Sequence, residues 1–125
     1  MDKAQLEFYL GRENAFGVNN VNDNDCIGWI LLSKRLPIAK FFERFTVDDD
    51  PKLFEEQVNI LKNPYNLWVA QLKREAYNSE KYPGNDDYLV NENHSFCSLD
   101  EVEEFLTKMK LNLGDLKWSS EIEFL

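Results

Sequence analysis

The run from Cys26 to Leu32 constrains the fold of this chain more than any other segment. Its seven residues carry no charge, and all of them are apolar apart from Gly28. A short and continuous apolar run of this kind is typical of a central β-strand that is covered on both faces. The sequence therefore predicts a sheet at the centre of the fold.

The segments on either side of this run indicate further strands and loops. Apolar and polar residues alternate over 4–10, as in a half-buried strand, and less regularly over 16–21. Residues 11–14 and 19–25 are rich in turn-forming side chains and read as loops. The first third of the chain thus predicts a meander of two or three strands.

The hydrophobic period changes to a helical one after Pro37. Apolar residues at helical spacing predict helices over 37–45, 51–62 and from Tyr65 to about residue 79. Asp50 and Pro51 give the second of these an N-terminal cap and a suitable first residue. The four phenylalanines of the first two helices are expected in the core: Phe41, Phe42, Phe45 and Phe54.

The last third of the chain returns to strands around one further helix. Residues 82–85 read as a turn, and residues 88–90 form a short strand core that can continue to Cys97. Ser98 and Glu101 form a capping box before an apolar stripe that predicts a helix over 99–109. Ile122 and Phe124 alternate with acids and predict a final strand.

Length and composition fit one domain. The chain has 125 residues, of which 43% are hydrophobic and 14% aromatic, so one core can form without disulfides or a structural metal. We expect one α+β domain over residues 1–125, with a small, mostly antiparallel sheet of about four or five strands packed against about four helices.

No motif in the sequence indicates catalysis or a bound metal. The single histidine, His94, lies near Glu92 and Cys97, but these spacings match no common zinc site. The loop containing Asp23 and Asp25 lacks the later oxygen ligands of a calcium-binding loop. We therefore expect a protein that is not an enzyme and that uses no cofactor and no metal.

The cysteines and the first residues indicate a reducing compartment. Cys26 and Cys97 show no paired spacing, and we expect both to be free and buried thiols. Residues 1–5 lack the basic and apolar parts of a secretory signal, and no apolar run is long enough to cross a bilayer. The expected location is the cytoplasm.

Negative charge is the most distinctive property of the sequence. The net charge is −9, and residues 82–125 contribute −7 through ten acids and three bases. Such a chain is not expected to bind nucleic acid or an anionic membrane directly, whereas it attracts a basic protein. The residues expected to bind this partner are Asp86, Asp87, Tyr88, Glu92, Asp100, Glu103 and Glu104.

A small acidic α+β domain with no catalytic motif and an acidic C-terminal part resembles the immunity proteins of interbacterial toxin systems. The closest resemblance is to those of contact-dependent growth inhibition and related polymorphic toxins of bacteria. It concerns the general character of the chain, so no family residue is transferred to a position here. The resemblance implies a tight inhibitor that blocks the basic active-site cleft of one cognate toxin, often a nuclease.

Three other functions are compatible with the sequence. A phage-type inhibitor or DNA mimic of a host nucleic-acid enzyme would have the same electrostatics. A small enzyme or ligand-binding domain would instead contain a deep cavity with a carboxyl of perturbed pKa. An adaptor or structural subunit would expose an apolar patch. For the toxin-binding protein we expect a monomer or a weak dimer.

Overall fold

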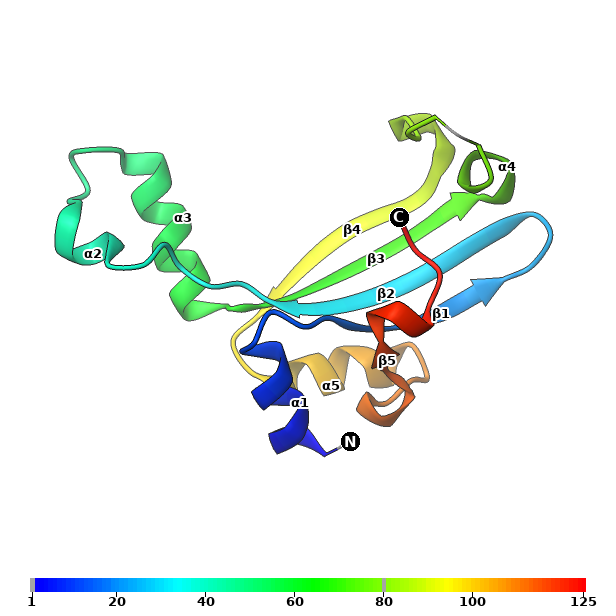
Figure 1. Ribbon diagram of the computed structural model, residues 1–125, viewed down its shortest axis with the longest axis horizontal. Coiled ribbons are helices and arrows are strands. Elements are labelled where there is room, and N and C mark those ends of the chain that lie inside the picture. Colours follow the sequence, from blue (N-terminus) through cyan, green and yellow to red (C-terminus); the bar gives the residue numbers. More distant parts are fainter. Residues whose placement is uncertain (1, 80) are drawn as a thin grey trace.

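The computed structural model describes residues 2–79 and 81–125, so Met1 and Glu80 of the expected domain lie outside the described residues. The domain is α+β, as predicted, and is built on an antiparallel sheet with the strand order β4-β3-β2-β1-β5 (Figure 1). The strands are β1 (Phe16–Asn22), β2 (Cys26–Lys34), β3 (Tyr65–Lys73), β4 (Tyr88–Phe96) and β5 (Lys117–Trp118). The apolar run of the sequence forms most of β2, the central strand, as predicted.

Two α-helices pack on one face of this sheet, and a third lies at its end. α1 (Lys3–Leu10) and α5 (Leu99–Lys108) lie below the sheet in Figure 1, whereas α4 (Arg74–Tyr77) follows the end of β3. Three short 3-10 helices lie in the C-terminal half: η1 (Asn85–Asp87), η2 (Leu113–Asp115) and η3 (Ser119–Glu121). Among the described residues, no helix combines the length and the hydropathy needed to cross a membrane.

Each face of the sheet has its own core. The first core joins α1 and α5 to the sheet through Leu6, Leu10 and Leu106 and through Tyr65, Leu67 and Val69 of β3. The second core lies on the opposite face, where Trp29 is fully buried and the C-terminal residues Ile122 and Phe124 pack. Both faces of β2 are therefore covered, which is the reason that its sequence is apolar without alternation.

Residues 35–64 form a separate projection, which we call the arm. It contains α2 (Phe41–Arg44) and α3 (Pro51–Lys62) and extends from one end of the sheet (Figure 1). None of its residues belongs to either sheet core. Its own small centre contains Phe41, Ile60 and Gln57, whose Oε1 accepts a hydrogen bond from the Ile38 N–H at 2.7 Å.

The predicted strand over residues 4–10 is wrong, because this segment forms α1. Asp2 and Gln5 make a capping box: the Asp2 carboxylate accepts the Gln5 N–H at 2.8 Å, and the Gln5 side chain accepts the Asp2 N–H at 3.1 Å. Leu6 and Leu10, four residues apart, are buried, while Phe8 between them is exposed. In a helix, residues four apart such as Leu6 and Leu10 lie on the same buried side. The alternation of apolar and polar residues therefore did not distinguish a strand from a helix here.

The predicted helix from Tyr65 to residue 79 is also wrong over most of its length. Residues 65–73 form β3, which pairs with β2 over its whole length and with β4 from Tyr65 to Leu72, and only α4 is helical. Tyr65 and Leu67 face the first core while Ala70 and Leu72 face the second. Because both faces are buried, apolar residues lack strict alternation and match a helical spacing by coincidence.

Three smaller predictions need correction. The helix expected over 37–45 is confined to α2, and the loop expected over 19–25 begins only after β1 ends at Asn22. Ile122 and Phe124 are not in a strand; they follow η3 and pack in the second core, while the strand near the C-terminus is β5.

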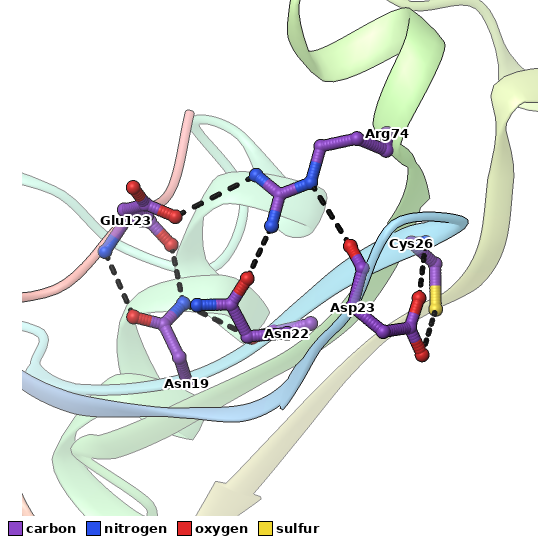
Figure 2. A network of polar contacts seen from close by, with 7 residues as sticks. Asn19, Asn22, Asp23, Cys26, Arg74 and Glu123 are labelled. Atoms are coloured by element: carbon purple, nitrogen blue, oxygen red, sulfur yellow. Dashed lines mark hydrogen bonds and ion pairs between the residues drawn. The ribbon is translucent and has the colours of Figure 1, made fainter.

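A network of polar contacts fixes the C-terminal segment to the β1–β2 hairpin (Figure 2). The Asn19 side chain donates to the Glu123 C=O at 2.7 Å and accepts the Glu123 N–H at 2.9 Å. Arg74 Nη1 lies 3.6 Å from the Glu123 carboxylate, and Arg74 Nε donates to the Asp23 C=O at 3.3 Å. This network holds Ile122 and Phe124 over the second core.

The contact between Tyr65 and Glu7 predicts a pH dependence of stability. The Tyr65 hydroxyl donates to the Glu7 carboxylate, and Lys34 Nζ lies 3.7 Å from that carboxylate. Burial, and then the bond to Glu7, raise the pKa of Tyr65 well above its ordinary value. The folded state therefore keeps the phenol protonated when the unfolded chain ionises it, at a pH of about 10. The stabilisation is complete below that pH and is lost as the pH rises further.

Tyr65→Phe is expected to lower the free energy of unfolding at neutral pH by about 1 kcal/mol, because one hydrogen bond is lost. It should also make the stability fall less between neutral and alkaline pH than in the wild-type protein. Urea unfolding across that range measures both effects. Tyr82→Phe is the matched control, since the Tyr82 side chain is 99% exposed. Equal alkaline losses in the wild-type protein and Tyr65→Phe would contradict the assignment.

Candidate partner-binding surface

α5 separates its acidic residues into two groups. Ser98 Oγ accepts the Glu101 N–H at 3.3 Å and starts the helix, and Leu99, Val102 and Leu106 bury its apolar side. Asp100 and Glu103 then point toward α1, where Lys3 Nζ lies 2.7 Å and 3.1 Å from their carboxylates. These bonds raise the pKa of Lys3. Two of the predicted site residues are thus paired with a lysine of the same chain.

Glu101 and Glu104 form the second group, on the side of α5 next to β4. Together with Phe96, Phe105 and Lys108 they line a shallow hollow of about 310 Å³. Glu101 also accepts the Cys97 N–H at 3.0 Å, so its side chain is held in place. Among the described residues, neither carboxylate forms an ion pair with a lysine or arginine.

Glu92 lies on β4, on the face of the sheet that α5 covers. Its Oε2 lies 3.2 Å from His94 Nε2, and the His94 ring stands 4.7 Å from the ring of Phe105. The Phe96 and Phe105 rings are 5.5 Å apart. Acidic groups therefore surround a small aromatic cluster where β4 meets α5. We call this surface the seam; its residues are Glu92, His94, Phe96, Glu101, Glu104, Phe105 and Lys108.

The remaining predicted residues lie elsewhere. Asp86, Asp87 and Tyr88 occur at the start of β4, and the strand runs from there over nine residues before α5 begins (Figure 1). Asp87 accepts the Gly84 N–H at 2.9 Å and so stabilises its own turn. Tyr88 packs against the second core. Of the seven predicted residues, the seam contains Glu92 and Glu104.

Sequence reasoning missed the rest of the seam for identifiable reasons. The capping box uses Glu101 only in part, and in the structure Glu101 also lines the hollow. Phe96 and Phe105 were counted as ordinary strand and helix residues. A usable signal was present: Glu101, Glu104 and Phe105 share one side of a helix, next to the apolar stripe that must face the sheet.

The arm exposes apolar side chains that were expected in the core. Phe42 is 41% exposed and Phe45 is 42% exposed, which corrects the prediction for these two residues. Phe41 is buried as predicted, and its ring lies 5.0 Å from that of Phe45. Leu36, Ile38 and Val47 on the same projection are each about half exposed. A four-residue helix cannot bury apolar side chains on all of its sides.

Cys26, Cys97 and Asp23 are not arranged as catalytic residues would be. Cys26 and Cys97 are free, as predicted, but Cys26 is half-buried and Cys97 exposed, so their expected burial is wrong. Burial, and then the charge of Asp23, raise the pKa of Cys26, which disfavours the reactive thiolate. The N–H groups of Cys26 and Asp25 lower the pKa of Asp23, opposite to the shift of a buried general acid. Within residues 2–79 and 81–125, no three metal-ligating side chains converge.

Comparisons of the chain with protein-family models, curated sequences and solved structures give no match.

Proposed function

We propose that this protein neutralises a basic protein toxin by binding it at the seam. The single observation that carries the proposal is the hollow in which the carboxylates of Glu101 and Glu104 lie beside the rings of Phe96 and Phe105, with Glu92 next to it through His94. A lysine or arginine of the partner would find carboxylates for its charge and aromatic faces for its aliphatic stem or guanidinium. The protein would act as a stoichiometric inhibitor without chemistry of its own, as the resemblance to bacterial immunity proteins implies.

The charge of the whole chain supports the same proposal. At −9, the protein attracts a cationic partner over distances set by the salt concentration, which accelerates association. At the seam, the carboxylates are exposed on a β-strand and an α-helix, so the backbone that carries them would lose little conformational freedom on binding. Among the described residues, Glu101 and Glu104 have no ion pair to a lysine or arginine, so they can pair with a toxin without first breaking a native ion pair.

Charge reversal at the seam tests this proposal. The wild-type protein and the double variant Glu92→Lys/Glu104→Lys would be used to capture partners from a lysate of the source organism. We expect the wild type to capture a basic protein that stops growth when expressed alone, and co-expression of this chain to restore growth. The double variant should associate at least about tenfold more slowly and show a weaker salt dependence, with a nearly unchanged thermal midpoint.

The matched control is Glu55→Lys/Glu56→Lys in α3, which changes the net charge by the same amount at exposed positions away from the seam. It should retain most of the association rate. If the seam variant and this control bind equally well, the seam is not the interface. If the captured protein is harmless to growth, the toxin-neutralising function is wrong.

The exposed apolar side chains of the arm favour a second candidate, an adaptor that docks through Phe42, Phe45 and Val47. The same capture experiment distinguishes the two candidates. Phe42→Ser/Val47→Ser should abolish capture if the arm is the docking site, and the seam variant should then bind normally. The toxin-neutralising candidate gives the opposite pattern.

A further inference from the structure

β4 is an edge strand, and its outer side is free. Within the described residues β4 pairs with β3 alone, and the strand order places it at one end of the sheet. Nothing lies alongside its outer edge in Figure 1. An edge strand of nine residues presents a row of backbone groups to which another strand can bond.

The backbone bonds at the two ends of β3 identify which groups of β4 are free. The Arg35 N–H donates to the Pro64 C=O at 2.7 Å, and the Arg74 N–H donates to the Asp25 C=O at 2.9 Å. Alternate residues of a central antiparallel strand bond to opposite neighbours. Even-numbered residues from 64 to 74 therefore bond toward β2, and odd-numbered residues of β3 bond toward β4.

The register then assigns each residue of β4. The odd-numbered residues Tyr65, Leu67 and Val69 pair with Phe96, His94 and Glu92. Those three residues of β4 use their N–H and C=O groups toward β3. The groups of Asn91, Asn93 and Ser95 consequently point away from the sheet, and all three residues are exposed. No hydrogen bond within the described chain reaches these outward groups.

The side chains along the free edge are hydrogen-bonded to neighbouring residues, and the edge has defined ends. The Asn91, Asn93 and Ser95 side chains accept hydrogen bonds from Trp68, Asn66 and Arg35 at 2.8, 3.2 and 3.1 Å, so these side chains face inward across the sheet. At one end the next outward N–H, that of Cys97, already bonds to Glu101. At the other end a register shift opposite Gln71 and Leu72 interrupts the pairing.

We infer that this edge accepts an extended segment of the basic partner as an additional strand; the inference rests on the proposed function. β4 contains no lysine or proline, two of the residue types that commonly protect an edge from pairing, and its charged glutamate would attract a cationic strand. Every second side chain of an added strand would lie beside Glu92 and the hollow of Glu104, so cationic residues at alternate positions fit this edge. A second copy of the chain would instead bring two molecules of net charge −9 together.

The first test uses a synthetic peptide, Lys-Thr-Lys-Val-Lys-Thr-Lys, with blocked ends, and the variants Asn93→Pro and Asn93→Ala. Both variants lose the bond to Asn66, but only proline removes the outward N–H. By fluorescence anisotropy, Asn93→Pro should bind the peptide at least about tenfold more weakly than Asn93→Ala, since a backbone bond is lost and the edge is blocked. The peptide should also slow hydrogen exchange of the Asn91, Asn93 and Ser95 amides.

A second measurement covers the case in which Asn93→Pro does not fold. Two further peptides of the same sequence are N-methylated, one at the odd-numbered and one at the even-numbered residues. Both keep every charge, but one of them loses the N–H groups that would bond to β4. At least one of the two should bind the wild-type protein about tenfold more weakly than the unmethylated peptide. Equal binding of all these peptides, or of the two variants, would mean attraction by charge alone and would overturn the inference. Absence of binding at millimolar peptide, or pairing of β4 with a second copy in sedimentation experiments, would also overturn it.

The toxin captured from the lysate separates this inference from the proposed function. If Glu92→Lys/Glu104→Lys loses the toxin while Asn93→Pro and Asn93→Ala bind it equally, strand addition is wrong and the seam remains the interface. If the toxin is indifferent to the charge reversal but requires the Asn93 N–H, the edge is an interface and the seam is not. If both Glu92→Lys/Glu104→Lys and Asn93→Pro lose the toxin, while Asn93→Ala retains it, the result supports both the seam interface and strand addition.

Discussion

Gly17→Ala is expected to destabilise the protein by about 3 kcal/mol, because a side chain at this position has no space. A Cβ atom on Gly17 would lie 2.5 Å from the Ile30 C=O oxygen and 2.6 Å from Ile122 Cδ1. The Ile122 side chain can move, but the Ile30 C=O belongs to the backbone of the central strand β2. Strands β1 and β2 would have to separate locally or release the C-terminal segment. The midpoint of urea unfolding measures this loss.

Gly11→Ala is the matched control. Gly11 has φ −65° and ψ −15°, and its nearest possible contacts, the Glu7 and Phe8 C=O oxygens, are at 3.5 Å. Alanine fits this helical conformation and should leave stability unchanged or raise it by up to about 1 kcal/mol. Similar losses of stability in Gly11→Ala and Gly17→Ala would show that the close approach of β1 and β2 is not the reason that position 17 requires glycine.

Leu106→Ala is expected to lower the free energy of unfolding by about 3 kcal/mol. Leu106 is fully buried between α5 and the sheet, and its removal leaves a cavity in the first core. Because α5 carries Glu101 and Glu104, a looser helix should also weaken binding at the seam. Thermal and urea unfolding measure the first effect, and the association rate with the captured toxin measures the second.

Leu61→Ala provides the comparison for Leu106→Ala with the same change of side chain. Leu61 lies in α3 and is 56% exposed, so its truncation should cost no more than about 0.5 kcal/mol. If the two leucine variants unfold at the same urea concentration, α5 does not depend on Leu106 for its position.

The parts of the fold that were predicted correctly have local causes. Asp50 accepts the Leu53 N–H at 3.1 Å, and Ser98 caps α5, so both helices begin where their side chains indicate. β2 was predictable because a strand buried on both faces needs an unbroken apolar run. α1 and β3 were predicted wrongly because apolar spacing fits two periods in short segments, and only the partners of each segment decide between them.

The candidate site was predictable only in part. The excess of acids after residue 82 is visible in the sequence, and many of these acids lie on or next to β4 and α5. Which acids remain available depends on neighbours from distant segments. Lys3, at the other end of the chain, pairs with Asp100 and Glu103, whereas no cation reaches Glu104 among the described residues.

By itself, the sequence determined the α+β class, the central strand, the two main capped helices and the negative charge of the C-terminal part, because these follow from composition and from contacts between near neighbours. Tertiary structure alone decided that residues 65–73 form a strand and that the arm stands apart from the sheet. It also decided which carboxylates surround Phe96 and Phe105 and which edge of the sheet stays open. These features depend on pairing between segments far apart in the chain, and no local pattern encodes such pairing.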